Sequence, residues 1–127
     1  MSETLYDAIG GAPAIEALVD RFYANMALWS EARTIRAMHG EDLTGVAHGL
    51  KAYLSEWLGG PALFSPTKGH PRMKMRHMHL AIGIAERDAW LACMKEALDA
   101  VVVDRAARMQ VYGNVEKLAD WMRNREG

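Results

Sequence analysis

The chain lacks several features that mark large classes of protein. Cys93 is the only cysteine, so an internal disulfide and a zinc or iron–sulfur site built from several cysteines are excluded. The formal net charge of -1 gives no broad basic field for nucleic acid. No apolar run approaches the roughly 18 residues of a membrane span, and MSETLYDAIGG lacks the basic start of a secretory signal. We therefore expect a soluble cytoplasmic protein, either a monomer or a homodimer, that binds neither nucleic acid nor membranes.

Motifs of common enzyme chemistries are absent as well. The sequence contains no H-E-x-x-H zinc motif, no G-x-S-x-G nucleophile turn and no phosphate-binding G-x-x-x-x-G-K-[ST] loop. A hydrolytic zinc site, a serine nucleophile and a nucleotide-binding loop are therefore not expected.

Apolar residues recur three or four positions apart through most of the chain, and strand-like alternation is nowhere sustained. The length of 127 residues and the scattered charges of both signs suit one globular domain. The sequence therefore predicts an all-α protein with a single domain over residues 1–127. The first predicted helix has Pro13 in its first turn and runs to about Leu28. The others run from Asp42 to the Gly59-Gly60-Pro61 turn, briefly from Pro71, from Glu86 to Val102 and from about Asp104 to Arg123.

Three of the five histidines lie in the stretch GHPRMKMRHMHLAIG. His77 and His79 are two positions apart, so on a helix they point to different sides, about 200° apart, and at most one of them faces inward. A site with one imidazole, a large apolar slot and a few buried polar groups is typical of b-type haem. His77 could bind the iron, and Tyr23 and Trp90 are candidates to donate hydrogen bonds to a ligand opposite it. The alternative is a haem-free helical interaction module whose aromatic residues are simply core.

Longer stretches of the chain point to a particular family. LYDAIGGAPAIEALVDRFYANM, YLSEWLGGP followed by GHPRMKMRH, and ERDAWLACM occur in this order. In this combination the chain resembles a group II truncated haemoglobin, and the resemblance runs from about Leu5 to Arg123. It implies a two-over-two helical sandwich around a haem pocket, with haem b as the cofactor.

The resemblance also implies roles for residues on the two sides of the haem. His77 matches the proximal iron ligand, and Arg76 matches a basic residue that pairs with a haem propionate, a partner that suits a guanidinium. Tyr23 matches the distal tyrosine, Trp90 the tryptophan that donates into the distal pocket, and His39 a variable polar position at the start of the distal wall.

Apolar side chains complete the pocket that the resemblance implies. Val46 falls where many globins place a distal histidine, and Leu50, one turn later, falls against the ligand. No imidazole is therefore expected close to the iron on that side. The residues placed along the haem slot are Tyr53, Leu54, Met73 and Ile82, together with Trp90.

The chain departs from the family directly after the predicted ligand. Family members have Pro-Phe where this chain has His79-Leu80, in HMHLAI. Without the proline the short helix can extend by about a residue or two, and His79 could then reach solvent, a haem propionate or the iron itself. His79 is therefore the alternative ligand. His48 and His70 are expected to be surface or capping residues, and Cys93 a small buried hydrophobic residue.

The leading hypothesis is a haem protein that reversibly binds dioxygen, carbon monoxide, nitric oxide, cyanide or similar small ligands at iron opposite His77. An enzymatic variant would oxidise nitric oxide to nitrate or use peroxide, in either case with an external reductant such as an unidentified reductase. Storage, sensing and detoxification all require polar stabilisation of oxygen, so the sequence does not rank these roles.

Overall fold

The computed structural model describes residues 3–39, 42–64 and 82–124. Its helices are α1 (Leu5–Ile9), α2 (Gly11–Leu28), the 3-10 helix η1 (Ser30–Ala32), α3 (Arg33–Ala37), α4 (Thr44–Trp57), α7 (Ile84–Val101) and α8 (Arg105–Trp121). These described ranges contain no strand, and the predicted all-α class is confirmed. None of their helices is both long enough and apolar enough to pass through a bilayer.

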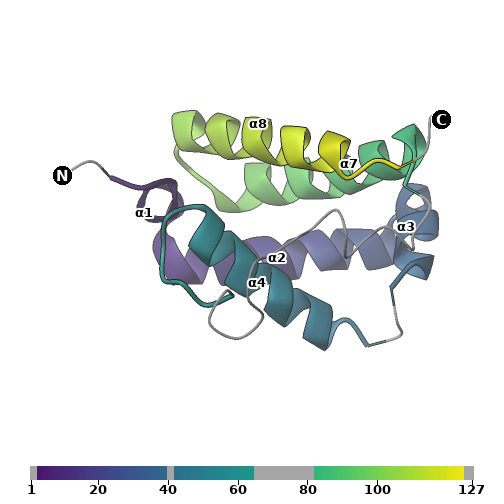
Figure 1. Ribbon diagram of the computed structural model, residues 1–127, viewed down its shortest axis with the longest axis horizontal. Coiled ribbons are helices and arrows are strands. Elements are labelled where there is room, and N and C mark those ends of the chain that lie inside the picture. The colour runs from purple at the N-terminus through teal and green to yellow at the C-terminus, as the bar shows by residue number, and fades with distance from the viewer. Residues whose placement is uncertain (1–2, 40–41, 65–81, 125–127) are drawn as a thin grey trace.

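The long helices form two layers (Figure 1). One layer contains α7 and α8, and the other contains α2 and α4. Helix α2 packs on α4 within its own layer and on α7 in the other, while α7 packs on α8. The two layers are therefore joined mainly through α2 and α7, and the predicted two-over-two arrangement is confirmed.

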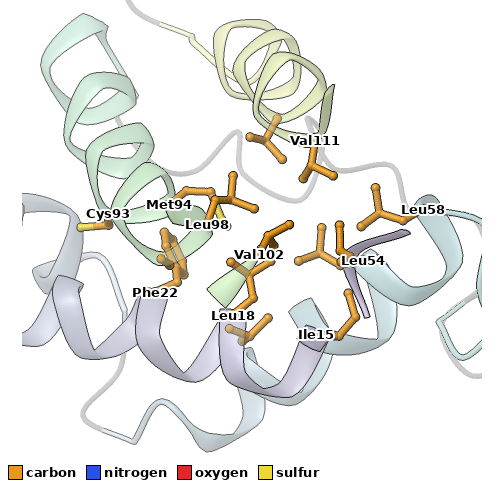
Figure 2. Packing of buried hydrophobic residues seen from close by; sticks show 14 of the residues in the cluster. Ile15, Leu18, Phe22, Leu54, Leu58, Cys93, Met94, Leu98, Val102 and Val111 are labelled. Atoms are coloured by element: carbon orange, nitrogen blue, oxygen red, sulfur yellow. The ribbon is translucent and has the colours of Figure 1, made fainter. Parts of the chain in front are cut away.

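The hydrophobic core is centred on the apolar stripe of α2. The stripe residues predicted to face inward are all buried: Ile15, Leu18, Val19, Phe22 and Met26. The side chains that surround part of this stripe in Figure 2 come from α4, α7, α8 and the positions that cap them: Leu54, Leu58, Cys93, Met94, Leu98, Val102 and Val111. Each fully buried leucine or phenylalanine contributes about 1.5–3 kcal/mol relative to an exposed one. The predicted burial of Cys93 is also confirmed.

Capping side chains explain where the helices begin. Asp104 accepts a hydrogen bond from the Ala107 N–H at 3.1 Å and caps α8, close to the predicted start of that helix. The Asp42 carboxylate accepts from the Thr44 N–H at 2.9 Å, although the helix-capping position itself is Leu43. Glu86 accepts from the Gly83 N–H at 2.7 Å and so lies inside the first turn of α7, which begins two residues before the predicted start.

Helix α2 begins at Gly11 and has Pro13 in its first turn, as predicted. Gly10 has a φ of +118°, a left-handed conformation that glycine adopts without steric cost, and it ends α1 and begins α2. Pro13 therefore lies inside the first turn, where a backbone N–H has no helical partner and a missing N–H costs little.

The Gly-Gly-Pro turn after α4 receives the N-terminal segment. The Tyr6 N–H donates to the Leu58 carbonyl at 2.9 Å, and a Cβ added at Gly60 would lie 2.5 Å from the Tyr6 ring. Only a glycine allows the tyrosine ring to pack this closely against the turn. The turn predicted as a helix end thus also anchors the start of the chain.

Candidate functional site

The structure describes most, but not all, of the residues predicted to form the site. The helix predicted to open at Pro71, and with it Met73, Arg76, His77 and the alternative ligand His79, lies outside the described residues. The identity of the iron ligand therefore stays a prediction. The described members of the predicted site are Tyr23, His39, Val46, Leu50, Tyr53, Leu54, Ile82 and Trp90.

The rings of Tyr23 and Trp90 both contact Phe22, and the ring of His39 contacts Tyr23. Phe22, which is fully buried, meets Tyr23 edge-on at 4.9 Å between ring centroids and Trp90 edge-on at 5.1 Å. His39 lies edge-on to Tyr23 at 6.0 Å. Residues from α2, from α7 and from the segment after α3 therefore come together, although Tyr23 and Trp90 are far apart in sequence.

The Tyr23 hydroxyl has the character of a buried donor. Burial of the side chain raises the pKa of Tyr23 to about 12, so the hydroxyl keeps its proton throughout the neutral range. Neither this hydroxyl nor the Trp90 indole N–H makes a hydrogen bond to the described part of the chain. Two protonated donors near Phe22 are thus available to a ligand.

His39 is held in one orientation by the backbone. Its Nδ1 lies 2.8 Å from the Ile35 carbonyl oxygen, and because a carbonyl only accepts, Nδ1 must donate. In the neutral ring Nε2 is then a hydrogen-bond acceptor. Beside the Tyr23 ring, His39 therefore offers an acceptor rather than a second donor.

Helix α4 supplies an apolar stripe that is only partly covered by protein. Val46, Leu50 and Tyr53 follow one another at intervals of four and three residues, which places them on one face. Tyr53 is buried, Leu50 is half-buried, and Val46 is 42% exposed. Leu54, one position on, belongs to the main core cluster. His48, predicted to point away from this stripe, is exposed.

Ile82 is tied to the end of α8 by two hydrogen bonds. Its N–H donates to the Asn124 side-chain oxygen at 2.9 Å, and its carbonyl accepts from the Asn124 N–H at 2.9 Å. The side chain of Ile82 is half-buried. Ile82, two residues before α7, is therefore fixed in place by the chain beyond α8.

Sequence reasoning missed a polar cluster next to the distal residues. Asn25 is buried in α2, and its amide donates to the Cys93 carbonyl and to Glu96, each at 3.0 Å. Arg21 donates to both oxygens of Glu96, at 2.7 and 2.6 Å. The only signal in the sequence is an amide residue next to Met26 in an otherwise apolar stripe, and nothing local identifies its partners.

Comparisons with known proteins agree with this architecture. The family described as bacterial-like globin matches residues 4–124. The group 2 truncated hemoglobin YjbI of Bacillus subtilis is 36% identical over 94% of this chain and 87% of its own length. The solved group II 2-on-2 hemoglobin of Agrobacterium tumefaciens is 41% identical, with a TM-score of 0.95 over 98% of this chain and 97% of that one. A truncated oxygen-avid haemoglobin from Bacillus subtilis is 35% identical, with a TM-score of 0.88 over 96% of this chain and 100% of that one.

The chain belongs to the group II truncated haemoglobins. Membership of this globin family implies a haem cofactor and the binding of small gaseous ligands such as oxygen.

The described residues of this truncated haemoglobin fit a haem group on two observations. The donors of Tyr23 and Trp90 are protonated and unpaired within the described chain, so they are free to meet a polar ligand. The apolar stripe of α4 is exposed to solvent at Val46. Such an exposed apolar face is expected where a flat apolar group such as haem would cover the helix. Within the described ranges, no cluster of three or more His, Cys, Asp or Glu residues competes as a metal site.

Proposed function

We propose that this truncated haemoglobin binds dioxygen, carbon monoxide, nitric oxide and similar diatomic ligands reversibly at the ferrous iron of haem b, with His77 as the proximal ligand. The single observation that carries the proposal is the pair of unpaired donors, Tyr23 and Trp90, placed beside Phe22. The haem group, when bound, supplies the iron centre to which a diatomic ligand attaches. The oxygen-avid relative from Bacillus subtilis, at 35% identity, supports dioxygen as one of these ligands.

The distal residues of the chain would stabilise the ligand by hydrogen bonding. Because the pKa of Tyr23 is raised to about 12, its hydroxyl can donate at any physiological pH without titrating. The Trp90 indole N–H is a donor at every pH. A hydrogen bond to a ligand that carries partial negative charge is worth about 1.5–3 kcal/mol, so each donor should slow ligand release.

The remaining predicted residues would hold the cofactor and keep water out. Val46 and Leu50 would present hydrocarbon where an imidazole could otherwise bind the iron, and this leaves the distal position to the gas. Arg76 would pair with a propionate. The other side chains that would line the slot are Tyr53, Leu54, Met73, Ile82 and Trp90.

We also propose that residues 1–127 form one globin domain. The family match from residue 4 to residue 124 supports this, because it leaves only a few residues at each end.

The proposal is tested first by spectroscopy on protein supplemented with haem. A strong Soret band that shifts when carbon monoxide is added to the reduced protein is the expected result. His77→Ala should abolish the native ferrous spectrum and weaken haem retention, while His79→Ala, the matched control, should leave both unchanged. The absence of a Soret band would overturn the haem proposal, and loss of haem only in the His79 variant would move the ligand to that residue.

A further inference from the structure

The buried amide of Asn25 connects the two helices that carry the distal donors. Its side chain is 7% exposed, and its nitrogen lies 3.0 Å from the Cys93 carbonyl oxygen and 3.0 Å from Glu96 Oε1. Cys93 and Glu96 are three residues apart on α7, so they lie on one face about a turn apart. One short side chain on α2 is therefore bonded to two successive turns of α7.

Arg21 contacts the solvent-facing side of this cluster, through Glu96 alone. It lies one turn before Asn25 on α2, and its guanidinium donates to both carboxylate oxygens of Glu96. The hydrogen bond from Arg21, followed by that from Asn25, lowers the pKa of Glu96 to about 2. At neutral pH the carboxylate is thus charged and accepts hydrogen bonds from both residues.

The Asn25 bonds lie close to the distal donors along both helices. Tyr23 is two residues before Asn25 on α2, and Trp90 is three residues before Cys93 on α7. Phe22 contacts both aromatic rings at centroid distances of 4.9 and 5.1 Å. A backbone carbonyl within a helix moves only with that helix, and Asn25 has a short side chain, so this bond restricts sliding of α2 along α7. Sliding of one helix would change the distance between the two donors, and hydrogen bonding weakens steeply with distance and angle.

We propose that Asn25 is a positioning residue that fixes α2 against α7 and thereby sets how Tyr23 and Trp90 together meet a diatomic ligand. Asn25 does not touch the ligand and acts only through the placement of the two donors. This inference rests on the proposed function of the distal site.

The test replaces Asn25 with leucine, which keeps the same branched skeleton of four heavy side-chain atoms but removes both N–H donors. In haem-loaded, reduced protein we expect Asn25→Leu to shift or split the C–O stretching band of bound carbon monoxide. Oxygen dissociation should become faster by about 3- to 10-fold, less than the loss of a direct donor such as Tyr23 would give. The infrared band reports the polarity around the ligand and does not depend on any activity.

Two controls separate positioning from general stability. Arg21→Met removes the outer guanidinium and leaves both acceptors of Asn25 in place, so the infrared band should stay where it is in the wild type. Val115→Ala opens a small cavity at a buried position of α8, which carries neither of the two donors, and serves as a control with a lowered melting temperature. If Asn25→Leu lowers the melting temperature as Val115→Ala does but leaves the band and the oxygen rate unchanged, the inference is wrong.

A second variant keeps the inference testable if Asn25→Leu does not fold. Glu96→Ala acts at a partly exposed position and removes one of the two acceptors of Asn25, so we expect a smaller shift of the band in the same direction. An unchanged band in this variant would then overturn the inference. Tyr23→Phe, measured in parallel, tests the proposed function itself. If Tyr23→Phe changes the band and the oxygen rate but Asn25→Leu does not, only the inference is wrong. If the protein binds no carbon monoxide, the proposed function is wrong.

Discussion

The two halves of α4 differ in what covers them. In the C-terminal half Tyr53, Leu54 and Ser55 are buried, and Trp57 stacks on Tyr53 with 5.7 Å between ring centroids. In the N-terminal half no residue is buried, although Val46 and Leu50 continue the apolar stripe. One half of the helix is thus completed by protein side chains, while the other presents hydrocarbon that the described protein leaves uncovered.

The contact between α2 and α7 differs from the uncovered first half of α4. Its side chains are closely packed around Phe22, and its buried amide is hydrogen-bonded to α7.

The largest effect should come from breaking the covered half of α4. Leu54→Ala removes a side chain that is 2% exposed and should lower the free energy of unfolding by about 2–5 kcal/mol. Leu50→Ala, the matched change in the uncovered half, should cost about 1 kcal/mol or less, because the wild-type side chain is only half-buried. Urea unfolding of the haem-free protein, in which no haem covers Leu50, measures both when it is followed by circular dichroism. Equal losses would remove the distinction between the two halves.

The next effect concerns the donors beside Phe22. Tyr23→Phe should speed oxygen release by about 10- to 100-fold, since a hydrogen bond of about 1.5–3 kcal/mol is lost, and Trp90→Phe should act in the same direction. Stopped-flow measurement of the oxygen dissociation rate provides the test. Tyr112→Phe on α8, which removes a tyrosine hydroxyl from the other layer, is the control and should leave the rate unchanged. Wild-type rates in both distal variants would contradict the assigned roles.

The smallest effect concerns how the stability of the contact between α2 and α7 depends on pH. Hydrogen bonds from Arg21 and Asn25 lower the pKa of Glu96 from its ordinary 4.5 to about 2. Glu96 therefore contributes stability above the ordinary pKa, and this contribution is lost as the pH falls from about 4.5 towards 2. In Glu96→Gln the melting temperature should fall less steeply across this window than in the wild type. Parallel curves for the two proteins would show that the Arg21–Glu96–Asn25 cluster does not contribute through its charge.

The parts of the fold that were predicted correctly have a repeating local signal. The stripe from Ile15 to Met26 identifies α2 and its buried face, and Asp104 marks the start of α8. Short elements such as η1 and α3 were not predicted, because a helix of three to five residues is too short to show a periodicity. The early start of α7 follows from the reach of one side chain, Glu86, back to Gly83, a contact that the apolar pattern does not contain.

The features of the candidate site likewise divide into those that were predicted from the sequence and those that were not. That Tyr23 and Trp90 lie near one another was implied by family resemblance, and the structure shows the phenylalanine between them. The bonds of Asn25 were not predictable, because its partner Cys93 is 68 residues away and is bonded through a backbone carbonyl, which every residue has. The tautomer of His39 depends equally on a backbone oxygen, that of Ile35.

The paired hydrogen bonds between Ile82 and Asn124 matter for anyone who attaches this protein to a surface or a fusion partner. Force applied beyond Asn124 would be divided between the end of α8, along the backbone, and the peptide groups of Ile82, through the two hydrogen bonds. A tether at the carboxyl terminus should therefore be long and flexible, whereas the same load at Glu3 would reach the Gly-Gly-Pro turn first, through Tyr6.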